Sequence, residues 1–438
     1  MKKVPLGFLA LFILIFSSSA HAISLLDLFY SAVENDPILK AAQSSKNAGA
    51  EAKPKALSKL LPKISVSGHA GKASHDIKNA IPEVEKERQI SNEIAISLVL
   101  SQPIFNLSAF REQKHAAIHQ TQSELRYRIA QQDLIFRVAE TYFTTLAYKD
   151  RLHFARSERN NIAKLIKIAE KRFENGQTEA FDVLEAQAKH DMALAREIKF
   201  ESQLLTQRDE LMRITGTTQD KLMAVKPDAP LIPPSPSNMQ DWTDTAREQN
   251  LFITIKKIEA SLIRQELGII RAKRYPTVDL NASYGRNDYG GAYPQNSLDA
   301  AITLNLNMTL YDGNHLSTHL REKKHVFERI MHEIEAKERE VTLNTRSSYL
   351  GVITGISYVK ALKQAIDSGE QALRSVHKGF EKREKSTIDV LNVQQELFKN
   401  KQEYANSRYQ YILSMLSLKQ NIGALSIDDL EQINNWLY

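Results

Sequence analysis

The sequence contains no cysteine and is poor in glycine and proline. The 16 glycines and 13 prolines make up about 7% of the 438 residues, where average usage is roughly 12%. Without cysteine, the chain can have no disulfide, no thiolate metal site and no lipid-modified N-terminal cysteine. The shortage of turn-forming residues favours long uninterrupted elements, most of them helices. The mean hydropathy of -0.38 excludes a bundle of membrane-spanning helices, because each would need roughly 20 consecutive apolar residues.

An export signal is predicted over residues 1–22. Two lysines precede a short apolar run that ends in an Ala-x-Ala pattern at Ala22, which is typical of a secretory signal peptide. The alternative is a short N-terminal anchor, but the run is too short to span a bilayer. The mature chain would begin near Ile23. Export makes the net charge of +6 weak evidence for nucleic-acid binding, and we predict no nucleic-acid partner.

The sequence contains an internal duplication. Five prolines crowd residues 226–237, which we interpret as an extended linker. Residues on its two sides match at a constant offset of 214, and of 207 after a change in loop length. The matched pairs include Ala32/Ala246, Pro62/Pro276, Tyr142/Tyr349, Phe173/Phe380, Asp182/Asp389, Gln187/Gln394 and Gly216/Gly423. We therefore predict two similar repeats, 23–225 and 238–438, rather than unrelated domains.

Each repeat is predicted to contain one very long helix. The stretch Asn106–Phe173 has neither glycine nor proline, and Asn314–Phe380 has no proline. With a rise of 1.5 Å per residue, each helix would be roughly 100 Å long. Apolar residues recur along the first at spacings of three and four, as in the seam of a coiled coil. Helices of this length predict an elongated protein.

Four segments between the helices alternate apolar and polar residues with a period of two. This pattern over about 9–11 residues is typical of transmembrane β-barrel strands, although a half-exposed soluble hairpin alternates in the same way. The apolar positions are Ile64, Val66, Gly68 and Ala70; Ile94, Ile96, Leu98 and Leu100; Val278, Leu280, Ala282 and Tyr284; and Ile302, Leu304, Leu306, Met308 and Leu310.

Four strands are too few to close a barrel in one chain. Single-chain outer-membrane barrels have about eight strands or more, and an open edge would leave backbone groups unpaired in lipid. Two, three or four chains would supply enough strands, although about eight strands leave an interior filled by side chains. The polar segments His75–Asn92 and Arg286–Asp299 are predicted to be loops at the extracellular end.

Short motifs are distributed along the chain: Asn35-Asp36-Pro37, Leu61-Pro62, Ser101-Gln102-Pro103-Ile104-Phe105, Tyr142-Phe143, Arg172-Phe173, Gly176, Arg213-Ile214-Thr215-Gly216 and Ile388-Asp389-Val390-Leu391. With this ordered set of motifs, the sequence resembles the TolC family of outer-membrane efflux proteins over essentially all of the predicted mature chain. The family implies an α+β, mainly α, membrane fold: a homotrimer with a 12-stranded outer-membrane barrel, four strands per chain, that continues into a periplasmic α-helical barrel. It also implies an exit duct of tripartite efflux or type I secretion systems, with a periplasmic adaptor and an inner-membrane transporter as partners.

The turn after each long helix is expected at the end farthest from the strands. Asn175-Gly176 suits a turn with positive φ, and Thr178 or Ser386 could cap the helix that follows. The resemblance implies that these tips dock the adaptor, through Asn175, Gly176 and Arg383. Because Arg383 stands where the family usually has glycine, an adaptor contact of the usual form is in doubt at the second tip.

Asp182 and Asp389 occupy matching positions near the two tips. By itself, an aspartate in a first helical turn complements the helix dipole. The resemblance implies that Asp389 lines the periplasmic constriction of the pore, where three carboxylates would favour cations. One helical turn after Asp389, where relatives often have a second aspartate, this chain has Asn392, so we expect a single ring of carboxylates. Phe380 stands where relatives can carry a hydrogen-bonding tyrosine, and Lys385, in place of the usual arginine, is expected to pair with Asp182.

Motifs of enzymes and metal sites are missing from the sequence. Two histidine pairs have the i, i+4 spacing that can hold a metal, His115 with His119 and His315 with His319, but no third ligand follows at a helical step. There is no G-x-S-x-G motif, P-loop or G-x-G-x-x-G motif. We predict a channel with no enzymatic activity, metal or cofactor. The alternatives are a periplasm-spanning structural or adhesive coiled coil without a pore and a secreted hydrolase or metal enzyme.

Overall fold

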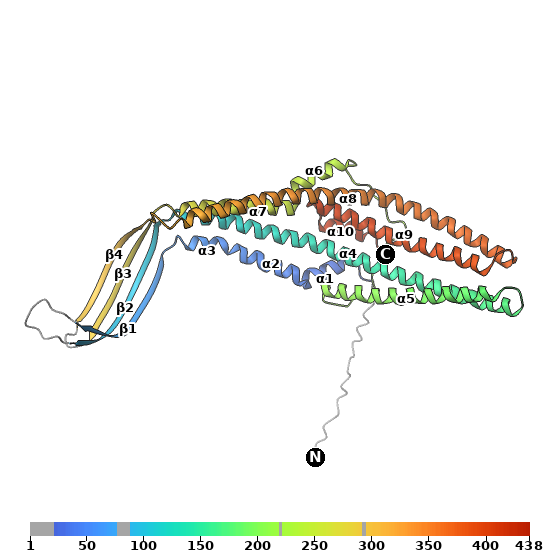
Figure 1. Cartoon of the computed structure of the whole chain (residues 1–438), viewed down its shortest axis with the longest axis horizontal. Coiled ribbons are helices and arrows are strands. Elements are labelled where there is room, and N and C mark those ends of the chain that lie inside the picture. The colour runs from blue at the N-terminus through green and yellow to red at the C-terminus, as the bar shows by residue number, and fades with distance from the viewer. Residues whose placement is uncertain (1–21, 77–87, 219–220, 291–294) are drawn as a thin grey trace, which may run out of the picture.

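The computed structural model describes residues 22–76, 88–218, 221–290 and 295–438. The chain is elongated, with a β-sheet at one end and long helices that run to the other end (Figure 1). The predicted signal peptide, 1–22, lies outside the described residues except for Ala22, as do the middle parts of both predicted surface loops.

The two halves of the chain follow a similar order, in which short helices precede two strands, a very long helix and a second long helix; three short helices precede the strands in the first half and two in the second. The first series is α1 (Leu25–Asn35), α2 (Pro37–Ala50), α3 (Ala52–Ser58), β1 (Lys63–Asp76), β2 (Arg88–Phe105), α4 (Leu107–Glu174) and α5 (Ala180–Thr215). The second series is α6 (Met239–Gln249), α7 (Leu251–Ala272), β3 (Thr277–Gly290), β4 (Gln295–Asn307), α8 (His315–Glu381) and α9 (Thr387–Asn421), followed by α10 (Ile427–Asn434).

The two long helices form where the sequence predicts them. Helix α4 has 68 residues and α8 has 67. Asn106 caps α4, because its side-chain oxygen accepts the backbone N–H of Ala109 at 3.0 Å. Within the described residues, none of the helices combines the length and the apolar character needed to cross a membrane.

The four strands form one antiparallel sheet in the order β1-β2-β3-β4, so that β2 and β3 join the two repeats. The register confirms the predicted alternation, because apolar residues share one face and small or polar residues share the other. One apolar row is Ile64, Leu100, Ala282 and Ile302, and the neighbouring row on the opposite face is Lys63, Ser101, Asn281 and Thr303.

The strands are longer than the sequence predicts. They have 14, 18, 14 and 13 residues, compared with the expected length of about 9–11. The predicted loops His75–Asn92 and Arg286–Asp299 are therefore partly strand: β1 runs to Asp76, β2 begins at Arg88 and β3 runs to Gly290. Ladder hydrogen bonds are made by the backbone, so polar side chains do not end the pairing.

The fourth strand ends before two residues assigned to it. Met308 and Leu310 lie beyond its last residue, Asn307. The chain turns there toward α8, and the carboxylate of Asp312 accepts the backbone N–H of Leu316 at 2.7 Å. This local turn outweighs the alternating pattern.

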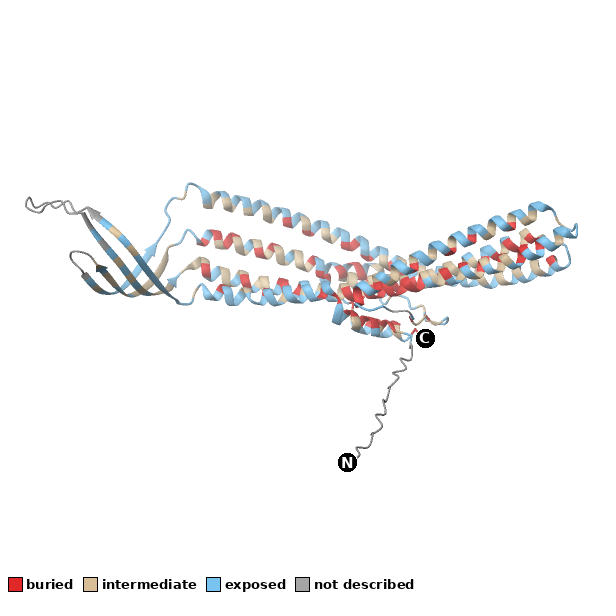
Figure 2. Cartoon of the chain, turned by 90° about the horizontal axis from the view of Figure 1, so that it is seen from below, coloured by how far each residue is buried: buried red, intermediate tan, exposed pale blue. Residues whose placement is uncertain are grey.

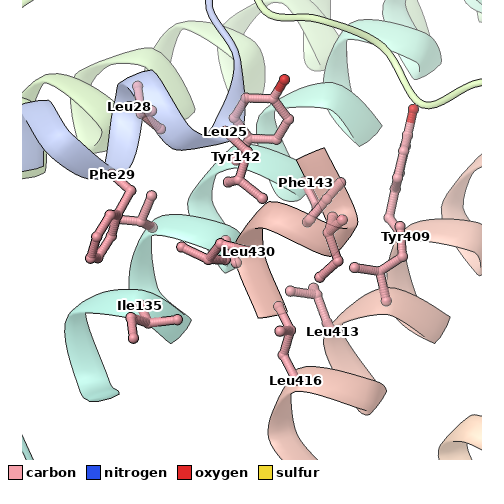
Figure 3. Close-up of a cluster of buried hydrophobic side chains, with 14 of the residues drawn as sticks. Leu25, Leu28, Phe29, Ile135, Tyr142, Phe143, Tyr409, Leu413, Leu416 and Leu430 are labelled. Atoms are coloured by element: carbon pink, nitrogen blue, oxygen red, sulfur yellow. The ribbon is translucent and has the colours of Figure 1, made fainter. Parts of the chain in front are cut away.

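The main core is a belt around the middle of the helical part, where α1 and α10 pack with α4 and α9 (Figures 2 and 3). The rings of Phe143 and Tyr409 stack at its centre, with centroids 5.8 Å apart. The hydroxyl of Tyr411 donates to the backbone oxygen of Ile232 at 2.9 Å and accepts the N–H of Ile232 at 2.6 Å. The proline-rich segment is thereby tied to α9.

A buried ion pair joins α2 to α4 beside this belt. Asp36 caps α2 by accepting the N–H of Leu39 at 3.0 Å, and it pairs with Arg137 at 2.7 Å. The side chain of Asp36 is only 1% exposed. Burial alone would raise the pKa of Asp36, but the hydrogen bonds from Arg137 and Leu39 outweigh burial and hold this pKa below its ordinary value.

We expect Arg137→Ala to lower the free energy of unfolding by about 3–5 kcal/mol at neutral pH, because the carboxylate of Asp36 would stay buried without its partner. The folded-state pKa of Asp36 is lowered, so its contribution is present above the ordinary pKa and lost as the pH falls through the folded-state pKa. The difference in the free energy of unfolding between wild type and variant should be smaller at about pH 3 than at neutral pH. Urea unfolding followed by circular dichroism measures it.

Arg126→Ala is the matched control, because Arg126 lies on the same helix and forms a more exposed ion pair, with Glu259. We expect this variant to lose less than about 1 kcal/mol. If Arg137→Ala lowered the free energy of unfolding equally at neutral pH and at about pH 3, the role given to Asp36 would be contradicted.

Candidate functional site

The first helical tip lies at the end of the molecule farthest from the sheet (Figure 1). The N–H of Gly176 donates to the oxygen of Phe173 at 2.9 Å, and the N–H of Gln177 donates to that of Arg172 at 2.8 Å. This pair of bonds is the Schellman motif, which ends a helix with a left-handed residue. Gly176 has a φ of 65°, so the predicted positive φ at Asn175-Gly176 is confirmed.

The second tip has the same turn, with Arg383 at the position of Gly176. The N–H of Arg383 donates to the oxygen of Phe380 at 3.2 Å, and the N–H of Glu384 donates to that of Gly379 at 2.8 Å. Arg383 has a φ of 66°, a conformation that costs a residue with a Cβ roughly 1–2 kcal/mol. The second tip therefore keeps the shape of the first and adds a long cationic side chain.

The helices that leave the tips begin differently. Ser386 caps α9 in a capping box, in which its Oγ accepts the N–H of Asp389 at 3.1 Å and its own N–H donates to the carboxylate of Asp389 at 2.9 Å. Helix α5 begins after Glu179, whose side chain makes no capping bond. The cap expected at Thr178 is wrong, because the Thr178 hydroxyl donates to the carboxylate of Asp182.

Asp389 is partly exposed and is ionised at neutral pH. The hydrogen bond from the backbone of Ser386, helped by the Ser386 side chain and the positive charge of Lys385, holds the pKa of Asp389 below its ordinary value. The capping box therefore accounts for an aspartate at this position within one chain, and its hydrogen bonds keep the Asp389 carboxylate charged.

Two contacts join the α4–α5 hairpin to the α8–α9 hairpin near the tips. The amine of Lys189 donates to the side-chain oxygen of Asn392. The guanidinium of Arg172 lies 3.7 Å from the centre of the Phe380 ring and donates to the backbone oxygen of Phe380 at 2.9 Å. Sequence reasoning missed this partner, because the two residues lie 208 positions apart and the Arg172-Phe173 motif does not specify what the arginine contacts.

The expected pair of Lys385 with Asp182 does not form within the described part of a single chain. The carboxylate of Asp182 accepts from Thr178. The stem of Lys385 packs over the backbone of Gly379, and its charge acts on Asp389. Within one chain, Lys385 therefore packs against the second tip itself.

The histidine pairs lie in the long helices. The rings of His315 and His319 have centroids 6.0 Å apart, and His115 lies 3.7 Å from the carboxylate of Glu266. Among the residues that the structure describes, no group of three or more histidine, aspartate or glutamate side chains is arranged to hold a metal ion.

An open sheet with one exposed apolar face, joined to long helices that end in paired turns, defines an outer-membrane channel subunit. The family model for outer membrane efflux proteins matches residues 28–217 and 242–424, and the chain belongs to this family. The predicted fold class is confirmed for the single chain, which is mainly helical and has one four-stranded sheet joined to long helices, as in the similar channel structures. The sheet end lies in the outer membrane and the helical part in the periplasm.

Similar proteins cover the chain almost completely. Outer membrane protein TolC of Vibrio cholerae is 27% identical over 439 residues, which cover 99% of this chain and 98% of that protein. Alkaline protease secretion protein AprF of Pseudomonas aeruginosa is 25% identical and covers 99% of this chain and 91% of its own length. The CmeC outer membrane channel of Campylobacter jejuni has a TM-score of 0.78 at 16% identity, covering 94% of this chain and 90% of that chain. The family consists of channel and transport proteins rather than enzymes.

We expect Arg383→Gly to stabilise the second tip by about 0.5–1 kcal/mol, because glycine has no Cβ to oppose the left-handed backbone. The matched control is Lys382→Gly, since Lys382 has a φ of -78° and its replacement should destabilise the same turn. Amide hydrogen exchange at the tip measures both effects. It should slow in the first variant and accelerate in the second, and acceleration in both would contradict the cost assigned to Arg383.

Proposed function

We propose that three copies of this chain form an exit duct that receives substrates from an inner-membrane transporter through a periplasmic adaptor. The observation that carries the proposal is the sheet, which has an apolar exposed face and open edges at β1 and β4. Closure with strands of other copies satisfies the edge groups in lipid, and outer-membrane lipid covers the apolar face. Helices of roughly 100 Å give the duct its reach toward the adaptor.

The names of similar proteins support a role of this chain in efflux and secretion systems. AprF is described as an alkaline protease secretion protein, and BepC of Brucella suis as an outer membrane efflux protein. We infer that the adaptor docks at the tips. Asn175 and Gly176 form the contact at the first tip, and the side chain of Arg383 gives the second tip a different, cationic one.

The periplasmic constriction is assigned to the second-repeat tip. Three Asp389 carboxylates, ionised because their pKa is lowered, would surround the axis and favour cations. Asp182 and Lys385 belong to the same gate as a pair between copies rather than within one. Phe380 and Asn392 hold the two hairpins of one chain together through Arg172 and Lys189.

The repeats 23–225 and 238–438, joined by the linker 226–237, follow the signal peptide 1–22 in this proposal. The two segments that match the family model fall on either side of the linker, which supports the division.

Conductance in a planar lipid bilayer tests the duct and its constriction. Trimers should open in steps and show a cation-selective reversal potential in a salt gradient. Asp389→Asn should move this potential toward zero, because it removes the charge but keeps an oxygen that can accept the N–H of Ser386. The control Asp182→Asn, at the matching position, should cause a smaller shift. No conductance from well-folded trimers would contradict the duct, whereas an unchanged potential in Asp389→Asn would contradict only the carboxylate ring.

A further inference from the structure

The apolar face of the sheet carries two cationic side chains near one end. The register pairs Lys72 of β1 with Asn92 of β2. It pairs Arg286 of β3 with Ile96 of β2, four residues from Asn92 and on the same face. Both cations are exposed. This end of the sheet points away from the helices (Figure 1), so it is the extracellular end of the membrane-spanning part.

A shallow apolar groove of about 370 Å³ crosses the same face nearer the helices. Its floor includes Leu100 and Ala282, which are half-buried. Its rim includes the exposed side chains of Ile64, Tyr284 and Ile302. An elongated apolar groove on a face that lies in lipid fits an acyl chain.

Arg286 lies on the extracellular side of this groove. It is four residues beyond Ala282 on β3, which is about 13 Å along the strand. A lipid with an acyl chain in the groove therefore has its headgroup near Arg286. Because this headgroup lies toward the extracellular end, the lipid belongs to the outer leaflet.

The guanidinium of Arg286 is oriented by Asp288, two residues further along the same face of β3. The Nε–H of Arg286 donates to the carboxylate of Asp288 at 2.9 Å. This bond uses Nε, so the two terminal nitrogens can donate to the oxygens of a phosphate. Asp288 offsets part of the positive charge of Arg286, and Lys72 adds a second positive charge on the same face.

The spacing of the two cations favours a headgroup with two phosphates. The register aligns Arg286 with Gly68 of β1 through Ile96, and Lys72 lies four residues beyond Gly68. With about 4.8 Å between strands and 3.4 Å per residue, the Cα atoms of Lys72 and Arg286 are about 16 Å apart. A single phosphate would require both long side chains to be fixed fully extended toward each other, which costs conformational entropy.

Two amide side chains accompany the cations at this level of the sheet. Asn92 and Asn296 are exposed on the same face, since Asn296 pairs with Asp288. An amide donates and accepts hydrogen bonds, so these side chains can bind the hydroxyl groups of a sugar. The face thus combines an acyl groove, two separated cations and partners for sugar hydroxyls.

We propose that this face binds a glycolipid of the outer leaflet that carries two phosphates. One acyl chain lies in the groove, one phosphate contacts Arg286 and the other contacts Lys72. Three copies would provide three such sites around the barrel, and the contacts would fix the height of the sheet in the outer leaflet. The inference rests on the proposed function, because the barrel of three copies exposes this face to lipid.

Native mass spectrometry of the purified protein in detergent, with bisphosphorylated lipid A as the probe, tests the site. We expect up to three lipid A molecules on each trimer. Lys72→Gln combined with Arg286→Gln should weaken binding roughly tenfold or more, because each cation near an anionic headgroup contributes to the affinity. The matched control is Lys63→Gln, which removes the same charge from the opposite face of β1 and should bind as the wild type does.

Two further measurements test the groove and the headgroup. Ala282→Leu combined with Ala300→Leu fills the groove and should weaken lipid A binding although both cations remain. Phosphatidylglycerol, which has one phosphate, should bind more weakly than lipid A. Equal binding of the two lipids would contradict a two-phosphate glycolipid, and wild-type affinity in the Lys72 and Arg286 double variant would contradict the site itself.

Conductance in a bilayer of phosphatidylcholine alone separates this inference from the proposed function. The wild type and the double variant should both open in steps there, because the duct itself needs no glycolipid. If both conduct and the wild type retains no lipid A, the glycolipid site is wrong and the duct stands. If the wild type forms no trimer, the proposed function fails and this inference fails with it.

Discussion

The requirement that backbone hydrogen-bonding groups be paired in lipid determines the rest of this structure. Strands β1 and β4 form the edges of the four-stranded sheet, and each unpaired group in hydrocarbon costs several kcal/mol. The apolar face of the sheet belongs in the membrane, and in the proposed trimer the edges meet strands of other copies.

The duplication extends this logic to the helical part. Strands β2 and β3 pair across the two repeats, and α4 packs on α9 across the same boundary. In the proposed trimer, the contact of β2 with β3 has a counterpart between chains, β4 with β1. One type of repeat contact would then be used both within and between copies.

The tips show how the two repeats have diverged on a common backbone. Gly176 and Arg383 have φ values of 65° and 66° in matching turns, although only glycine adopts them without cost. The guanidinium of Arg172 contacts the ring and the backbone oxygen of Phe380. The residue that corresponds to Arg172 in the second repeat is Gly379, which has no side chain. The contact between Arg172 and Phe380 is thus a feature of the packing between the two hairpins of one chain.

Sequence alone determined the features that depend on local backbone hydrogen bonding and periodicity. The lack of proline predicted α4 and α8, period-two alternation predicted the two faces of the sheet, and Asn175-Gly176 predicted a left-handed turn. Only the tertiary structure decided the length of the strands, the separation of Lys385 from Asp182 and the contact between Arg172 and Phe380. The strand ends depend on pairing with a neighbouring strand. The side-chain contacts depend on how whole hairpins pack, and Arg172 and Phe380 lie 208 positions apart in the sequence. No local pattern encodes such distant partners.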